Sequence, residues 1–418
     1  MLPANRLEEA CRGGAWHESP RLQCLDFDCS VRANDPTLVD YITWLYEACS
    51  RTGPPSHRFI VRRRTASREA VTTVYRDGIP LVRDVPPGLA VARLVWEINQ
   101  ATVAASGHRL LLHAAAAERD GAVALLPGPP GAGKSTFVAG LVQAGLRYVT
   151  DETVAVDPST RTIESYPKPI ALDRGAPVLA TLHIPVPEAL ESGSPQLLAP
   201  PQAFRADAVA PPGGVARVIL FAKYRPGRAT APVPLSRAEA AVALAEHSFN
   251  FRALGPGALE LVADVVRAGR CYRLGVSDLG AACRHVAELL DEPGDGRGGF
   301  TVVRNPDLET TLRMSDAEFP AGEGVPQREP DVEWVELDGE VVAYDPVTQT
   351  LHRLNGSAAQ VWAACDGSTS VADIVRAMQS TFDGGSDVID RDVRRLLQHL
   401  RQLGLLRVPP VDHYAAGT

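Results

Sequence analysis

The sequence lacks three things: a long apolar run, a basic N-terminal segment followed by an apolar one, and any pair of cysteines with CxxC spacing. The first two absences predict that the chain has no membrane-spanning helix and no signal peptide. The seven cysteines are odd in number and scattered, which disfavours a disulfide framework or a zinc site and favours small buried thiols. We therefore expect a cytoplasmic protein.

Basic residues are also fewer than acidic ones. The 418 residues include 42 Lys and Arg against 50 Asp and Glu, so the formal net charge is −8. This balance disfavours broad binding to nucleic acids or anionic membranes, and we predict neither as a partner. The 45% hydrophobic and 22% charged residues are typical of a globular protein, and the length suits two or three domains.

The pattern along the chain changes three times. Strand-like segments and one helix over 88–105 come first, and alternating strands and helices then indicate an α/β core. A stretch rich in glycine, proline and acidic residues follows, which is typical of a linker. We predict four parts: a mixed α/β subdomain over 1–108, the core over 109–295, a linker over 296–330 and a small domain over 331–410.

The core segments have distinct signatures. Apolar strands are expected at 110–118, 122–128, 147–156 and 217–224, and an amphipathic helix is expected from Gly133. Ser236 and Glu239 have capping-box spacing and predict the start of another helix.

The last ninety residues have a plan of their own. Alternating residues over 334–354, with turn signals at Asp338-Gly339 and Asp345-Pro346, predict a three-stranded meander. Three helices should follow, the first beginning after Asn355 and the second capped by Ser370. Gly404 is placed to end the third.

One motif carries clear chemistry. Residues 128–135, GPPGAGKS, match GxxxxGK[ST] and lie between an expected strand and an expected helix. Glycines let the loop amides converge on phosphate oxygens, Lys134 can reach the β- and γ-phosphates, and the Ser135 hydroxyl can bind Mg²⁺. The predicted nucleotide-binding residues are Gly128, Gly131, Ala132, Gly133, Lys134, Ser135 and Thr136.

Four further residues are possible members of the site. Asp151 and Glu152 follow an apolar run, where acids can hold a metal or take a proton, although exposed turns often carry the same residues. His113 lies in an apolar strand, where a lone histidine is more often a core residue. Lys168 is taken as a surface lysine.

The stretch from His113 to Asp157 resembles the HPr kinase/phosphorylase family and its HPr-kinase-like relatives. The matching elements are His113, the GPPGAGKST loop and the acidic pair in TDETVAVD. The resemblance implies a P-loop sheet related to phosphoenolpyruvate carboxykinase, with ATP and Mg²⁺ as cofactors. It also implies that Asp151 is the catalytic base, that Glu152 and Ser135 hold the metal, and that His113 and Lys134 assist catalysis.

Two features depart from that family. Glu152 stands where the bacterial enzymes usually have a second aspartate, and no segment similar to EIRGLG is present. HPr is therefore a poor candidate for the substrate. The segments YPKPIALD and RVILFAKYRPG resemble HPr-kinase-related proteins found with peptide-modifying gene clusters. The HPr kinases assemble into rings, and the sequence leaves oligomerisation of this chain open.

Residues 331–408 resemble PqqD, a small winged-helix-like protein with a three-stranded sheet and three helices that recognises ribosomally made peptides. The matching features are the meander, HRLNGSAAQVW, SVADIV and a final LGLL. The resemblance implies that a leader peptide adds as a strand beside the third strand and packs against the third helix. The predicted peptide-binding residues are Thr350, Leu351, His352, Arg353, Arg394, Arg395 and Arg401. The arginines at 391, 394, 395 and 401 make the third helix basic, which suits an acidic leader, although each could also be an ordinary solvated residue.

These resemblances together predict an ATP- and Mg²⁺-dependent kinase that phosphorylates a Ser or Thr hydroxyl of a precursor peptide, with the leader docked on the C-terminal domain. Other enzymes of a peptide-modification pathway are further expected partners. Two alternatives stay open: a kinase acting on a small metabolite, and a non-catalytic nucleotide-gated peptide chaperone.

Overall fold

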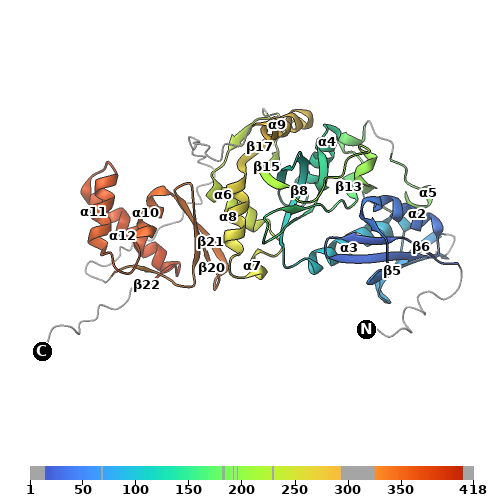
Figure 1. Ribbon diagram of the computed structural model, residues 1–418, viewed down its shortest axis with the longest axis horizontal. Coiled ribbons are helices and arrows are strands. Elements are labelled where there is room, and N and C mark those ends of the chain that lie inside the picture. Colours follow the sequence, from blue (N-terminus) through green and yellow to red (C-terminus); the bar gives the residue numbers. More distant parts are fainter. Residues whose placement is uncertain are drawn as a thin grey trace. The chain divides into compact units, whose positions relative to one another are not determined.

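The computed structural model describes residues 15–66, 69–180, 184–191, 193–194, 196–227, 230–292 and 325–407 (Figure 1). The chain divides into two compact units. The first contains the residues up to Val233 together with His247–Leu254 and the segment from Ala268. The second contains Pro234–Glu246, Gly255–Arg267 and the C-terminal residues. Residues 296–324 of the predicted linker, and Cys11, lie outside the described residues.

The N-terminal part of the first unit is a seven-stranded sheet with the order β4-β2-β3-β5-β6-β7, in which β1 also pairs with β3. Helix α2 was not anticipated; Asp35 caps it by accepting from the Thr37 amide, and Pro36 begins it. The elements are β1 His17–Glu18, β2 Arg21–Cys24, β3 Phe27–Ala33, α2 Pro36–Leu45, β4 Ser50–Arg51, β5 His57–Ala66, β6 Glu69–Arg76, β7 Ile79–Val85 and α3 Pro87–Ala105.

The second sheet of this unit has the order β12-β11-β8-β9-β15-β17-β16, with β10 also paired to β8. Strand β15 runs parallel to both β9 and β17. The elements are β8 Leu110–Arg119, β9 Ala122–Pro127, α4 Lys134–Gln143, β10 Arg147–Thr150, β11 Thr153–Val156, β12 Ile163–Glu164, β13 Ile170–Asp173, α5 Glu188–Glu191, β14 Gln196–Ala199, β15 Val215–Tyr224, β16 Pro232–Pro234, α7 Phe251–Leu254, β17 Arg270–Val276 and α9 Leu279–Asp291.

The second unit contains a three-stranded sheet, β19-β20-β21, in the predicted meander order. The predicted helix caps are confirmed: Asn355 accepts from the Ala358 amide, and Ser370 accepts from the Asp373 amide. The elements are α6 Arg237–Glu246, α8 Ala258–Ala268, β18 Gln327–Arg328, β19 Glu333–Leu337, β20 Glu340–Asp345, β21 Thr350–Leu354, α10 Gly356–Ala364, α11 Val371–Thr381, α12 Ser386–Gln402 and β22 Leu406–Arg407.

Both faces of this small sheet are covered. Val341, Ala343 and Leu354 pack in one core with α10, α11 and α12. Because side chains alternate along a strand, Val342 faces the other way, and it too is fully buried. On that side α6 contacts all three strands. Two segments predicted to lie in the α/β core, those containing α6 and α8, are therefore grouped with the C-terminal sheet.

The predicted strands and helices of the first unit are confirmed in part. Of the described N-terminal strands, β3, β5 and β6 match the three that were predicted, and β1, β2, β4 and β7 were not predicted. The helix predicted over 88–105 spans 87–105, and the strands predicted at 110–118, 122–128 and 217–224 are β8, β9 and β15. The single strand expected over 147–156 is wrong, because it breaks at Asp151 and Glu152 into β10 and β11. The six described cysteines are buried free thiols. Among the described helices, none combines the length and apolar character needed to cross a bilayer.

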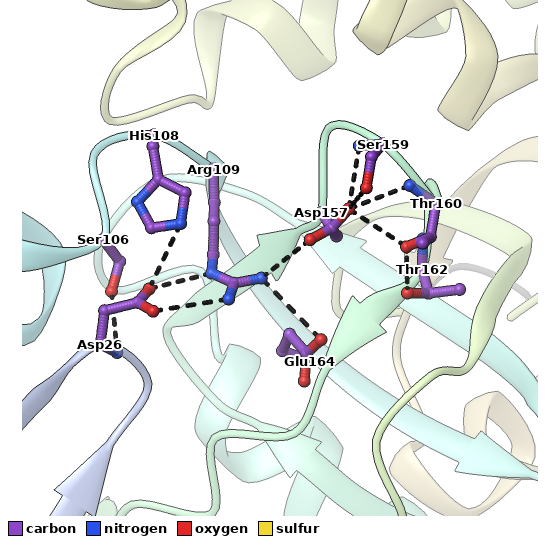
Figure 2. A network of polar contacts seen from close by, with 9 residues as sticks. All are labelled: Asp26, Ser106, His108, Arg109, Asp157, Ser159, Thr160, Thr162 and Glu164. Atoms are coloured by element: carbon purple, nitrogen blue, oxygen red, sulfur yellow. Dashed lines mark hydrogen bonds and ion pairs between the residues drawn. The ribbon is translucent and has the colours of Figure 1, made fainter.

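Arg109 joins the two sheets of the first unit (Figure 2). Its guanidinium lies 2.9 Å from Asp26 in the β2–β3 turn, 3.4 Å from Asp157 after β11 and 3.8 Å from Glu164 in β12. Burial opposes ionisation of Asp26, but the hydrogen bond and charge of Arg109 outweigh it and lower the pKa of that carboxyl. Hydrogen bonds from Ser159 and Thr160 lower the pKa of Asp157.

Replacing Arg109 by Met should lower the melting temperature by about 2–4 °C at neutral pH, which corresponds to roughly 1 kcal/mol. Because Arg109 lowers the pKa of Asp26, the contribution of this pair is complete above the ordinary value of 3.8 and is lost as the pH falls below it. Melting curves of wild type and variant should therefore converge on acidification. Arg119→Met, which removes a more exposed pair with Asp291, is the control; equal shifts in both variants would contradict this account.

Candidate functional site

The glycine-rich loop lies at a strand–helix junction, as its motif requires. Strand β9 ends at Pro127, and α4 begins at Lys134. Gly131 and Gly133 have φ angles of 77° and 84°, in the left-handed region that glycine adopts without strain. The residues between β9 and α4 thus curl back to the start of the helix, whose free amides and dipole favour a bound anion.

Lys134 lies against the loop and a histidine of the neighbouring strand. Its ammonium group donates to the carbonyls of Gly128 and Pro129, at 2.8 and 3.0 Å, and lies 3.1 Å from Nε2 of His113. Burial lowers the pKa of Lys134. Burial and the charge of Lys134 together lower the pKa of His113 to about 4, so the imidazole is neutral at pH 7 and can accept from the lysine. The centroid of the Phe249 ring lies 5.2 Å from that of the His113 ring.

Asp151 is the most enclosed acid of the site, with 3% of its surface exposed. The Ser135 hydroxyl donates to its Oδ2 atom at 2.8 Å. Its Oδ1 atom lies 2.9 Å from the Tyr148 hydroxyl and 2.7 Å from Nζ of Lys168. The structure therefore brings the loop serine and the first acid of the pair into direct contact.

A β-bulge in β10 allows the side chains of Tyr148 and Asp151 to lie on the same side of the strand. The register against β8 shifts between Tyr148 and Thr150, so Val149 is an extra residue in the strand. Residues three apart point to opposite faces of a regular strand, and an inserted residue restores them to the same face. Tyr148 and Asp151 can therefore meet, and the strand then breaks at Asp151 and Glu152.

Lys168 is a site residue that the sequence analysis placed wrongly on the surface. Its side chain is 3% exposed, and its Nζ atom lies 2.7 Å from Asp151 and 3.3 Å from Glu152. Burial alone would lower the pKa of Lys168, but the two carboxylates outweigh it and raise the pKa above its ordinary value. Prolines flank Lys168 in YPKPIALD and restrict the backbone on both sides of it. This was the sequence feature that could have indicated a buried lysine.

The segment that carries Lys168 is held from two sides. The Tyr166 amide donates to the carbonyl of Val149, and the Tyr166 ring is buried in the core of the N-terminal sheet. The Cys49 thiol lies 3.6 Å from the Pro167 carbonyl. The two residues that precede Lys168 therefore pack against the N-terminal part of the first unit.

Glu152 differs from its neighbour in exposure. About a third of its side chain, 35%, is exposed, and its carboxylate contacts Lys168. Its charge also acts on His113 and on Lys134, so it lies among the loop lysine, the histidine and the buried lysine. The structure gathers all the residues predicted as catalytic or metal-binding: His113, Lys134, Ser135, Asp151 and Glu152.

The predicted peptide-binding residues lie in the second unit. Strand β21 is at one end of its sheet, and α12 packs in the core that Leu354 enters. The strand pairing puts Thr350 and His352 on the α12 side, and Leu351 and Arg353 on the α6 side. Arg353 pairs with Glu239 of α6 at 3.5 Å.

Helix α12 is less basic than the arginine count suggests. Asp387, Asp390 and Asp392 lie on the same helix as the arginines at 391, 394, 395 and 401. Arg394 is half-buried and pairs with Asp390 at 3.0 Å. The suggestion that this helix favours an acidic leader is thereby weakened, because its charges largely balance.

Comparison with known proteins finds a similarity for the C-terminal part. Residues 340–406 match the family model described as coenzyme PQQ synthesis protein D (PqqD). This part of the chain is similar to PqqD. A similar solved structure, "TbiB1 in Complex with the TbiA(beta) Leader Peptide", is 23% identical, and the match covers 22% of this chain and 99% of that chain with a TM-score of 0.19. No curated protein matches the chain.

Removing one partner of the buried Lys168–Asp151 ion pair should strongly destabilise the first unit. Lys168→Met leaves an uncompensated buried carboxylate and should lower the free energy of unfolding by about 3–5 kcal/mol in denaturant titrations. Adding Asp151→Asn to that variant should restore part of the loss, because the stranded charge is gone. The exposed Lys223→Met is the control, expected within about 0.5 kcal/mol of wild type. A mild effect of Lys168→Met would mean that the pair is solvated.

The imidazole of His113 should titrate far below an ordinary histidine. Because its pKa is lowered from 6.5 to about 4, the neutral form stabilises the fold, and this contribution is lost as the pH falls between those values. NMR titration of ring protons, assigned with His113→Gln, should give a midpoint near 4. In Lys134→Met the midpoint should rise, since a neighbouring cation is removed. A wild-type midpoint near 6.5 would refute the arrangement.

Proposed function

We propose that the chain is an ATP- and Mg²⁺-dependent phosphotransferase of the HPr-kinase-like type. Its acceptor is a Ser or Thr hydroxyl of a ribosomally synthesised precursor peptide, and its PqqD-like region docks the leader of that peptide. The observation that carries the proposal is the contact between the Ser135 hydroxyl and buried Asp151 beside a loop with the GxxxxGK[ST] sequence.

The chemistry of the site suits its proposed ligands. Mg²⁺ prefers hard oxygen ligands, and the Ser135 hydroxyl and Asp151 carboxylate supply two that already adjoin. The loop amides, the start of α4 and Lys134 supply positive charge for a triphosphate. Mg²⁺ would neutralise phosphate charge during transfer. The acceptor hydroxyl would give its proton to one of the two acids, Asp151 or Glu152.

Leader docking is supported by the PqqD match and by the position of β21. A strand at the end of a sheet offers backbone amides and carbonyls to a further strand. Helices cover both faces of this sheet, and among the described residues β21 pairs only with β20, so the outer edge of β21 is the side on which an extended peptide would fit.

Joining the two activities in one chain has a physical rationale. Phosphoryl transfer depends on holding the acceptor oxygen in line with the γ-phosphate. A tethered leader raises the effective concentration of the attached core peptide at the site, so the core itself needs only weak contacts.

The test is mass spectrometry of the precursor peptide encoded beside this gene after incubation with the protein, Mg²⁺ and ATP. We expect a gain of one phosphate, and a marked loss of rate when the leader is removed. Lys134→Ala should slow transfer by about 10²-fold or more, because it removes a cation aimed at the transferring group. Lys223→Ala is the matched control.

Two other outcomes would contradict parts of the proposal. Transfer that is independent of the leader would point to a smaller acceptor and leave the PqqD-like region with another role. Leader binding with nucleotide binding but without any transfer would refute the kinase assignment.

A further inference from the structure

The outer edge of β21 is flanked by a helix that lies outside the PqqD-like region. Helix α6 precedes residues 340–406, the part matched by the family model, yet it contacts β21 directly. Glu239 in its first turn pairs with Arg353 of that strand at 3.5 Å. The sheet face beneath the helix is apolar, since Val342 and Tyr344 are both buried there. Helix α6 is therefore packed against the strand that forms this edge.

Two helices divide this face of the sheet between them. Helix α8 and the residue before it reach β19: the Arg267 side chain donates to the Glu336 carbonyl at 3.4 Å, and the Gly257 amide donates to Glu333 at 3.3 Å. Helix α6 lies beside α8, to which it is hydrogen-bonded, and extends to β21. A helix with its side chains is about 10 Å across, whereas neighbouring strands lie about 4.8 Å apart. Helix α6 thus also covers the place that a strand added to β21 would take.

Side chains at this edge point alternately to two helical layers. Thr350 and His352 lie on the α12 side, whereas Leu351 and Arg353 lie on the α6 side. Leu351 is only half-buried, so part of its apolar surface is open at the edge. A strand paired with β21 would present its own side chains to the same two layers in turn.

The face of α6 that carries Glu239 is also incompletely covered. Val242 and Ala243 follow Glu239 at the three- and four-residue spacing of one helix face, and both are half-buried. Apolar side chains of a docked strand can pack there and on Leu351, and this burial stabilises the complex. The charges of Glu239 and Arg353 balance each other. This face therefore suits apolar side chains better than a strongly acidic or basic segment.

We propose that α6 forms a second wall of the leader-docking site, opposite α12. This wall rests on the leader docking put forward under the proposed function, and it determines which leaders fit. A strand with one covered face has apolar residues at alternate positions, whereas a strand covered on both faces has them at consecutive positions. The partner is then an extended leader segment as long as β21, five residues, with apolar side chains at neighbouring positions.

The pattern of leader residues that matter for binding tests the second wall. Affinity is measured by fluorescence anisotropy, with the full chain and a labelled synthetic leader from the precursor encoded beside this gene. In an alanine scan of the leader, losses of about tenfold or more are expected at neighbouring positions, because each of them buries an apolar side chain. Losses confined to every second position would mean that only one wall contacts the leader, and would overturn the proposal.

A variant of the helix gives an independent test. Ala243→Lys places a charged side chain on the α6 wall and should weaken leader binding by about tenfold or more. Leaders that already carry alanine at the α6-facing positions should lose less, since the two changes act on one contact. Ala377→Lys, on the exposed side of α11, is the matched control and should bind as wild type does.

Melting curves establish whether both variants are folded. Wild-type affinity in folded Ala243→Lys would overturn the proposal. If Ala243→Lys does not fold, the alanine scan of the leader decides, because it leaves the protein unchanged.

Failure of the proposed function has different signatures. Leader binding of the expected pattern without any phosphate transfer would refute the kinase assignment and leave the second wall standing. Absence of leader binding would refute both leader docking and the second wall. A chain that binds no leader but dimerises in sedimentation experiments, with the dimer broken by Ala243→Lys, would show that a second copy occupies this edge instead.

Discussion

The buried contact between Lys168 and Asp151 is the constraint on which the candidate site depends. A carboxylate this enclosed needs a cation and hydrogen bonds, and Lys168, Tyr148 and Ser135 supply them. The same contact fixes the loop serine, the broken strand and the segment around Tyr166 relative to one another. The N-terminal part of the first unit also supports the site, because its hydrophobic core includes Tyr166, two residues before Lys168.

Local patterns predicted much of the fold. The strand–loop–helix around Gly128–Ser135, the C-terminal meander and the caps at Asn355 and Ser370 depend on neighbours in sequence, and each lies where it was expected. The apolar run over 147–156 looked like one strand, because nothing local marks the extra residue at Val149. The segments of α6 and α8 were assigned to the core because they lie within the range 109–295; the capping box at Ser236 and Glu239 predicts where a helix begins but not which sheet it packs against.

The site was predictable in part. The loop motif, the acidic pair and His113 could be found because spacing and family resemblance mark them. Lys168 could not, since a lone lysine is usually exposed and its partners lie more than ten residues away in sequence. The charge of α12 was misjudged by counting arginines without the aspartates between them, of which Asp390 pairs with Arg394.

The extra residue in β10 makes chain length a functional property of this strand. Because the extra residue keeps Tyr148 and Asp151 on one face although they are three positions apart, a further residue inserted between them would turn Asp151 away from Tyr148. Removing Val149 would leave the two side chains two positions apart on a regular strand, again on one face. Single-residue insertions between Tyr148 and Asp151 are thus far less tolerable than substitutions there. Related chains that share this site should keep the tyrosine and the first acid on the same face of the strand even where the residues between them differ.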